Sequence, residues 1–577
     1  MKKPASSLLF LALLAGCNGD NMMTADAGAD DGPGVPVAAT YRATHYDFTM
    51  DLATRVARSQ VTAEIVAPGN CLTIGFEPAA ATDVTLDGQV PDSVAVQNAT
   101  LAACRAGLRL WNKGDRVILA ATAEVPQTTI KSSQVGYSVR KDMTGQPFTY
   151  LVSWVNGCDH HGACDAAPDR FATYRFTVDH PAGTGVLCPG TIKEESATRT
   201  VCDFNYDGGP TYSGFGFAAS PSWKTTALGD WGGVKVDLYD YAPTGIAAAL
   251  DRAAAQAHFV WMQSLFGAYP YGKELRFVVG PTYWSGFEHP GNIVLAETLA
   301  RGQSSYSDGL RHVQMHEVVH QWAGDRTTLA GTYDFVWKEA MAEYLTFIYE
   351  DEKIAPDDGQ TTAAAWKEWS RVATYYPVPG EKPELFNYYG DAYGPGPMVL
   401  FRQLESMYSR KAVQGALKSL IGGPAPRALS IDDVRMALEQ ATGAKLDNYF
   451  NAWVRGMGRP AWPRATVKVT DVGGGTSKVE LTVTTKDNVP RGCAFKIRLL
   501  GDVNKGEHYD VPVNLGPDGG PFAPAMVKPG FAVTGSEVDP LNECLIWPAG
   551  TPPLVKPDPS AIERTEPMAI EPWRAVQ

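Results

Sequence analysis

The spacing of apolar residues changes twice along this chain. Between residues 41 and 240, apolar and polar residues alternate in short runs such as that from Tyr46 to Leu52, which is the period of a strand with one buried face. From residue 241 to 462 the apolar residues fall close to helical spacing, and from 463 to 548 the alternation returns. We therefore predict a multidomain α+β protein with an N-terminal β-domain, a mainly α domain and a small C-terminal β-domain.

The composition excludes several classes of protein. Of the 577 residues, 44% are hydrophobic and 20% are charged, which is close to the average of globular proteins and unlike a wholly disordered or fibrous chain. The 50 basic and 63 acidic residues give a net charge of −13. Because nucleic acids attract basic surfaces, we expect no nucleic-acid partner.

The N-terminus has the features of an export signal. Lys2 and Lys3 precede an apolar run that is too short to span a membrane, so residues 1–16 are predicted to be a signal peptide. The order Leu-Ala-Gly-Cys that ends at Cys17 resembles the bacterial lipobox, in which the cysteine is lipidated; ordinary cleavage nearby is the alternative. We expect an exported protein that a flexible tether, residues 17–40, anchors to a bacterial cell membrane. A proline-rich tail, residues 549–577, ends the chain.

The cysteines other than Cys17 number eight, an even count that predicts up to four disulfides in an exported chain. Eight cysteines allow 105 pairings, and the simplest is sequential. It joins Cys71 to Cys104, Cys158 to Cys164, Cys188 to Cys202, and Cys493 to Cys544. The histidines between Cys158 and Cys164 leave a small metal site as the alternative for that loop.

Two histidines in the run His316-Glu317-x-x-His320 carry the clearest chemical signal. On a helix, side chains four positions apart lie on one face, so both imidazoles can bind one metal ion. Glu317 is displaced by one position and can approach a water molecule at the metal without binding the metal itself. Neutral imidazole suits zinc, and a catalytic zinc site needs three protein ligands and one open position. The other histidines, His312 among them, are expected to be structural or to lie at the surface.

A third ligand should come from a neighbouring element. Glu339 lies 19 residues after His320 in a helix-compatible run, and the segment between them can form a turn. Two antiparallel helices would place Glu339 against the histidine pair. Glu343, one helical turn later, could accept a hydrogen bond from the second nitrogen of a ligand histidine and so fix its orientation.

Taken together, these runs resemble the membrane alanyl-aminopeptidase family of gluzincin zinc peptidases. The resemblance is carried by the histidine motif with Gln-Trp-x-Gly after it and by Trp-x-Glu339-x-x-Ala-Glu-Tyr. Further along, Gly286-Phe-Glu288-His-Pro resembles the family's Gly-x-Met-Glu-Asn exopeptidase motif. The run from Tyr393 to Leu400 resembles the segment that holds the family's catalytic tyrosine. The likeness covers roughly residues 41–460.

The resemblance implies a fold and a set of roles. Residues 241–462 would form a thermolysin-like catalytic domain that holds one Zn²⁺ per chain through His316, His320 and Glu339. Glu317 would act as the general base, and Tyr393 would hydrogen-bond the oxygen that becomes negative.

The substrate side of the site also follows from the resemblance. Gly286 and Glu288 would bind substrate, with the Glu288 carboxylate on the free α-ammonium of a peptide. Residues 463–548 would form a small β-sandwich, and the large helical C-terminal domain of long family members would be absent, which would leave the cleft more open.

Several positions depart from the family's pattern. Lys338 and Ala340 stand where Asn and Gly are usual, and Asp325 stands where Asn is usual. The ammonium of Lys338 could point outward or could weaken the site. Near Trp154 there is no Gln or Glu of the kind that also holds the substrate amine in the family.

We predict a zinc metallopeptidase that removes N-terminal residues from peptides. Two alternatives stay open. One is an endopeptidase on the same scaffold. The other is a surface binding protein with a degraded zinc site, which Lys338 and Ala340 suggest.

Overall fold

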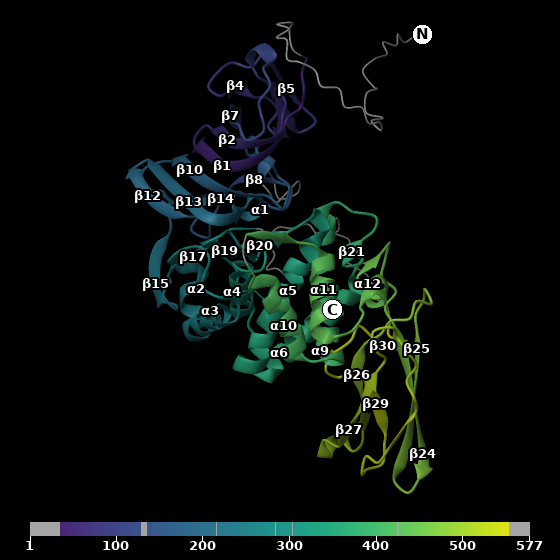
Figure 1. The fold of residues 1–577 in the computed structure, drawn as a ribbon. Coiled ribbons are helices and arrows are strands. Elements are labelled where there is room, and N and C mark those ends of the chain that lie inside the picture. The colour runs from purple at the N-terminus through teal and green to yellow at the C-terminus, as the bar shows by residue number, and fades with distance from the viewer. Residues whose placement is uncertain are drawn as a thin grey trace, which may run out of the picture.

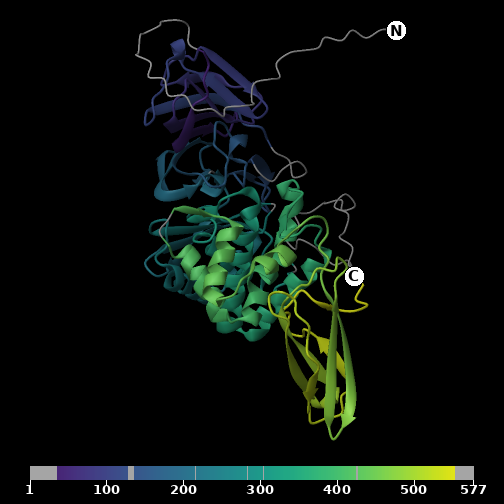
Figure 2. The ribbon, with the colours of Figure 1, turned by 45° about the vertical axis from the view of Figure 1, so that its right-hand side comes forward.

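The computed structural model describes residues 35–127, 136–214, 216–282, 284–302, 304–423 and 426–552. The predicted signal peptide, Cys17, the first part of the tether and all but the start of the tail lie outside these residues. β-Sheets of the N-terminal region lie at one end of the molecule, helices fill the middle, and the C-terminal strands lie at the other end (Figure 1). In the turned view of Figure 2 the C-terminal strands again extend away from the helices, opposite the N-terminal sheets. The protein is therefore multidomain, with a large N-terminal β region and a helical part.

Three sheets make up the N-terminal region. The largest has seven strands in the order β12-β13-β10-β1-β2-β7-β4, and the others have the orders β11-β14-β9-β8 and β3-β6-β5. In β1, Tyr46, Phe48 and Met50 are all buried, as the alternation predicts. The strands are β1 (Thr40–Asp51), β2 (Val56–Ala67), β3 (Cys71–Gly75), β4 (Thr82–Leu86), β5 (Ser93–Gln97), β6 (Thr100–Cys104), β7 (Arg116–Glu124), β8 (Gly136–Lys141), β9 (Pro147–Val152), β10 (Phe171–Asp179), β11 (Gly185–Leu187), β12 (Thr191–Ser196), β13 (Arg199–Pro210) and β14 (Gly216–Ser220).

The central sheet begins before residue 241, the predicted start of the mainly α domain. Its order is β15-β16-β17-β19-β18, and β16 pairs with β17 in parallel. Alternation identifies β15 and β16 as strands but carries no information about their partner, which is why they resemble the strands that precede them. The strands are β15 (Lys224–Asp230), β16 (Lys235–Asp240), β17 (Glu274–Gly280), β18 (Gly286–Phe287) and β19 (Asn292–Ala296).

One long helix, α3 (Arg252–Phe266), lies between β16 and β17, and further helices follow the sheet. These include α4 (Gly309–His320), α5 (Phe335–Tyr349), α6 (Pro356–Val372), α7 (Leu385–Ala392), α8 (Pro395–Pro397), α9 (Gln403–Met407), α10 (Arg410–Ile421), α11 (Ile431–Thr442) and α12 (Asp447–Trp453). The side chain of Asp308 caps α4 by accepting from the backbone N–H of Arg311 at 3.0 Å. Gly324, with a φ of 137°, forms the turn after α4. All 15 residues of α5 are buried, so each charged residue on it needs a partner.

Two further sheets form the C-terminal region. Their orders are β28-β25-β24-β30 and β27-β26-β29. An ion pair of 2.5 Å between Nζ of Lys367 on α6 and Oδ2 of Asp539 joins this region to the helices. The strands are β24 (Arg464–Gly473), β25 (Thr476–Thr484), β26 (Ala494–Leu500), β27 (His508–Asn514), β28 (Ala525–Val527), β29 (Gly535–Val538) and β30 (Trp547–Pro548).

All four predicted disulfides are present. Cys71 is bonded to Cys104, Cys158 to Cys164, Cys188 to Cys202, and Cys493 to Cys544. The sequential pairing is confirmed, and the metal-site alternative for the loop 158–164 is wrong because its thiols are bonded to each other. Across the described ranges, no helix has both the length and the apolar composition needed to cross a membrane.

Candidate functional site

Three ligand atoms from α4 and α5 converge on one point. Nε2 of His316 lies 3.0 Å from Nε2 of His320. Oε2 of Glu339 lies 3.2 Å from the first nitrogen and 3.3 Å from the second. Zinc–ligand bonds of about 2.0–2.1 Å in a tetrahedron place ligand atoms about 3.3 Å apart. These side chains therefore fit a zinc ion, and the three residues predicted as ligands are the three that meet.

The second ring nitrogen of each imidazole, Nδ1, also lies near a protein oxygen atom. Nδ1 of His316 lies 3.1 Å from Oε1 of Glu343, and Nδ1 of His320 lies 2.9 Å from the carbonyl oxygen of Ala323. Such contacts fix the tautomer and the ring orientation of a metal-binding histidine. The structure thus places Glu343 where the sequence predicts it.

Excess negative charge surrounds the converging atoms. Burial lowers the pKa of His316, but the carboxylates of Glu339 and Glu343 outweigh burial and raise it to about 10. Burial raises the pKa of the Glu317 carboxyl, and the charges of Glu288 and Glu339 raise it further. A carboxyl group drawn toward its neutral form and an imidazole drawn toward its charged form both indicate an environment that favours a cation.

Glu317 has room to act because a glycine faces it. A Cβ atom on Gly286 would lie 2.3 Å from Oε1 of Glu317, so a larger residue at this position of β18 would displace the Glu317 side chain. Oε2 of Glu317 is buried and has no hydrogen-bond partner among the described residues. Such an oxygen is available to a water molecule or a substrate.

Two tyrosines at the end of α7 lie near Glu339, and one of them contacts its carboxylate directly. The hydroxyl of Tyr393 donates to Oε2 of Glu339 at 2.8 Å, and the hydroxyl of Tyr389 lies 2.9 Å from that of Tyr393. Tyr389 was not among the predicted site residues. Its position one helical turn before Tyr393 is the sequence signal that could have found it.

Lys338 bridges two carboxylates instead of pointing outward. Its Nζ lies 2.6 Å from Oε1 of Glu288 and 2.6 Å from Oε1 of Glu339, and its side chain is 2% exposed. Burial lowers the pKa of Lys338, but the two carboxylates outweigh burial and raise it above its ordinary value. Burial raises the pKa of Glu288, and Lys338 more than reverses that shift. All three groups are therefore charged.

Asp325, the other charged departure, is buried behind the site. It accepts from the hydroxyl of Ser213 at 2.5 Å and from Nε2 of Gln321 at 3.3 Å. Burial and the charge of Glu288 raise its pKa well above the ordinary value. A protonated carboxyl group at this position can donate as well as accept hydrogen bonds, as an asparagine does.

His312, which we expected to be structural or to lie at the surface, is buried and reaches Glu343. Nε2 of His312 lies 3.3 Å from Oε2 of Glu343, and Nε1–H of Trp366 donates to the same oxygen at 2.6 Å. Since His312, His316 and His320 are spaced by four residues, they share one helix face, and that spacing was visible in the sequence. His312, His316 and Glu343 also lie close enough to hold an ion. We assign His312 and Glu343 a supporting role, because the other nitrogen of His316 faces Glu339 and His320.

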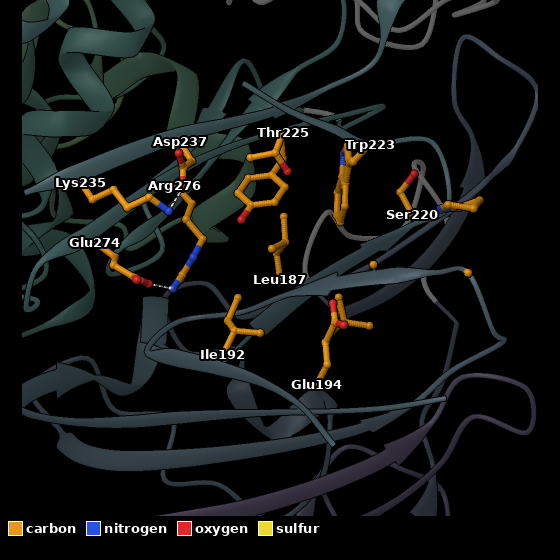
Figure 3. A pocket seen from close by; sticks show the side chains of 15 residues that line it. Leu187, Ile192, Glu194, Ser220, Trp223, Thr225, Lys235, Asp237, Glu274 and Arg276 are labelled. Carbon is orange, nitrogen blue, oxygen red and sulfur yellow. Dashed lines mark hydrogen bonds and ion pairs between the residues drawn. The ribbon is translucent and has the colours of Figure 1, made fainter. Parts of the chain in front are cut away.

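A cavity of about 550 Å³ lies apart from these residues, between β11, β14 and the strands β15 to β17 (Figure 3). Trp223 and Tyr239 line it together with two ion pairs, Lys235 with Asp237 and Arg276 with Glu274. None of the predicted site residues lines this cavity.

Comparison with known proteins agrees with the motifs. Residues 250–453 match the Peptidase family M1 domain. Aminopeptidase N of Streptomyces lividans is 24% identical over 313 residues, which cover 50% of this chain and 36% of that protein. This chain thus spans about a third of the length of that curated relative. The predicted family resemblance is confirmed.

Solved structures share the fold. A mutant M1 zinc metallopeptidase from Deinococcus radiodurans superposes with a TM-score of 0.60 at 18% identity, covering 72% of this chain and 94% of that one. The same enzyme bound to a Tyr-Ser-Ala substrate gives a TM-score of 0.59 at 19% identity, with the same coverage of both chains.

Proposed function

We propose that this protein is a zinc-dependent metallopeptidase that releases N-terminal residues from peptides. The match of residues 250–453 to the Peptidase family M1 domain supports this proposal. The observation that carries the proposal is the convergence of His316, His320 and Glu339 at the spacing of zinc ligands. This intact geometry favours an enzyme over a binding protein with a degraded site.

Each of the site residues would have a separate role in hydrolysis. His316, His320 and Glu339 would hold one zinc ion, which supplies Lewis acidity at the scissile carbonyl and acidifies the attacking water. Glu317 would take the proton of that water and pass it to the leaving amine, and its buried Oε2 has no partner among the described residues that would block this role. Tyr393 donates a hydrogen bond to the carbonyl oxygen as that oxygen becomes negative.

Glu288 is the residue that favours release of N-terminal residues over internal cleavage. Its buried carboxylate lies on the other side of Lys338 from the ligand Glu339. A carboxylate in that position can pair with a free α-ammonium and so place the first peptide bond over the metal. The Tyr-Ser-Ala complex of the Deinococcus enzyme supports a peptide as the kind of substrate.

A second candidate is an endopeptidase on the same scaffold. It is favoured by the ion pair of Glu288 with Lys338, which engages the carboxylate expected to bind the amine. It is also favoured by Trp154, an apolar residue in the segment where the family resemblance implies a second side chain that binds the substrate amine.

One experiment separates these candidates. Purified protein is given peptides with free and with N-acetylated termini, with and without a zinc chelator, and the products are identified by mass spectrometry. The proposal predicts chelator-sensitive release of N-terminal residues. Internal cleavage of both kinds of peptide would favour the endopeptidase, and no hydrolysis of any peptide would contradict both.

The location of the protein belongs to the same proposal. The lipobox-like run before Cys17 supports export and lipid anchoring to a bacterial membrane, and the four disulfides suit an oxidising compartment. We also propose that the C-terminal strands form a β-sandwich and that the cleft has no helical roof. Between residues 454 and 552, all of which are described, the only helical element is the turn Val503–Lys505. Lipid attachment is tested by mass spectrometry of the N-terminal peptide, with Cys17→Ala as the control.

A further inference from the structure

Lys338 occupies the side of Glu288 that faces the ligands. Its ammonium lies 2.6 Å from a carboxylate oxygen of Glu288 and 2.6 Å from one of Glu339. The contact with Glu339 is a charge-assisted hydrogen bond, and the contact with Glu288 is an ion pair. The side chains of Lys338 and Glu288 are 2% and 5% exposed, so water screens their interaction little.

This arrangement changes what Glu288 can do for a substrate. A free α-ammonium that approaches Glu288 meets a carboxylate whose charge Lys338 already balances. It also meets the lysine's own positive charge at short range. The substrate amine therefore gains attraction to Glu288 only if it displaces the ammonium of Lys338, which is tied to two carboxylates at once.

The other carboxylates near Lys338 have their own roles, because Glu339 would hold the zinc ion and Glu317 would act on the water molecule. The ring of Phe335 lies 5.5 Å from Nζ of Lys338. The ring of Trp154 packs edge-on against Phe335 at 5.6 Å and against Tyr389 at 5.3 Å. An acyl group on the substrate nitrogen is apolar apart from its carbonyl oxygen. It suits an aromatic wall, and Lys338 can donate a hydrogen bond to that oxygen.

We propose that Lys338 is a specificity-determining residue that competes with the substrate amine for Glu288, so that the site accepts peptides whose N-terminal nitrogen is acylated about as well as peptides with a free amine. This inference rests on the proposed peptidase function and defines the substrate class of the same site. A purely structural role for Lys338 would change the affinities for both kinds of peptide alike. The proposed role changes the ratio of the two affinities.

The test measures that ratio in four proteins: the parent chain, Lys338→Met, Lys338→Arg and the double variant Lys338→Met/Glu288→Gln. All four also carry Glu317→Gln, which prevents turnover. Each is loaded with zinc, its zinc content is measured, and calorimetry gives its affinity for Leu-Ala-Ala amide and for the N-acetylated form of the same peptide. A change in zinc affinity or in folding affects both peptides alike and cancels in the ratio.

The parent chain is expected to bind the two peptides within about threefold of each other. Lys338→Met frees Glu288 for the amine and should favour the free peptide by about tenfold or more, the worth of a hydrogen bond between charged groups. Lys338→Arg keeps the cation and should keep the parent ratio, and the double variant should lose the gain.

Two results would overturn the inference while leaving the proposed function intact. One is a parent chain that already prefers the free amine by a hundredfold, and the other is a ratio that Lys338→Met does not change. If neither peptide binds to any of the four proteins, the site does not take peptides, and the proposed function is wrong together with the inference.

Discussion

Oε1 of Glu343 lies 3.1 Å from Nδ1 of His316, on the side of the imidazole away from Glu339 and His320. The same carboxylate accepts from Trp366 and lies beside His312. Glu343 is 2% exposed, so this contact is protected from water and salt. The buried carboxylate of Glu343 thus orients the proposed ligand His316 without being a proposed metal ligand itself.

Replacing Glu343 should therefore weaken zinc binding without removing a ligand. For Glu343→Ala we expect a loss of about 10- to 100-fold in zinc affinity, the usual cost of removing such a partner. Competition with a fluorescent chelator measures it. Glu368→Ala on the exposed face of α6 is the matched control and should bind zinc as the parent does. An unchanged affinity in Glu343→Ala would show that His316 needs no partner.

A methyl group at position 286 should disable the general base. In Gly286→Ala the new Cβ would lie 2.3 Å from Oε1 of Glu317, and the carboxylate must move. We expect kcat to fall by about tenfold or more, because general bases act only within hydrogen-bond reach. Zinc content should not change. Gly415→Ala on α10, where nothing lies within 4 Å of the added atom, is the control and should keep full activity.

The two site tyrosines should differ in the size of their effects. Tyr393→Phe removes the donor to the developing negative charge and should lower kcat by about 10²- to 10³-fold with little change in KM. Tyr389→Phe removes only the hydroxyl that holds Tyr393 and should cost about tenfold or less, the net worth of one hydrogen bond. Tyr388→Phe, whose hydroxyl contacts Pro377, should leave kcat unchanged. Equal losses in Tyr389→Phe and Tyr388→Phe would contradict the assignment.

Acid should destabilise the protein through two buried neutral histidines. Burial lowers the pKa of His258 to about 3 and that of His289 to about 4. The unfolded chain takes up protons below about pH 6.5 while these folded residues stay neutral, so the free energy of unfolding falls as the pH drops from 6.5 toward 4. At pH 5 each should cost about 2 kcal/mol.

Denaturant unfolding at pH 7.5 and at pH 5 measures this loss. His258→Phe keeps the aromatic packing against Tyr349 but cannot take up a proton, so its stability should fall less between the two pH values. An identical fall in the parent chain and in His258→Phe would show that His258 is not responsible.

The ion pair between Lys367 and Asp539 should hold the C-terminal strands to the helices. Lys367→Met leaves the buried carboxylate of Asp539 without its cation, and the cost of breaking a buried pair in this way is about 3–5 kcal/mol. The double variant Lys367→Met/Asp539→Asn removes both charges and should recover part of that loss. Thermal unfolding measures both single variants, Lys367→Met and Asp539→Asn, and the double variant. A double variant as unstable as the sum of its parts would mean that the two charges do not interact.

The local parts of the site could be predicted because helix geometry fixes them. A spacing of four residues aligns His316 with His320, and Glu339 lies on α5, the next α-helix along the chain. The disulfides followed sequential order. The same geometric rule applied to His312, one turn earlier on α4, and would have placed it on the same helix face.

The remaining features depend on tertiary contacts that no local period encodes. Glu288 precedes Lys338 by 50 residues and follows an edge strand, so its ion pair with Lys338 exists only when β18 packs against the helices. β15 and β16 have the pattern of any strand, and only their pairing places them in the central sheet. Sequence periodicity indicates the kind of element but not its partner.

The proposed mechanism depends above all on Glu317, which would act as the base beside a zinc ion held by the three ligand residues. The most direct test is the rate of N-terminal residue release by Glu317→Gln that carries one zinc per chain. We expect unchanged zinc content and a kcat lower by about 10²-fold or more. Full activity in a zinc-loaded Glu317→Gln protein would contradict it.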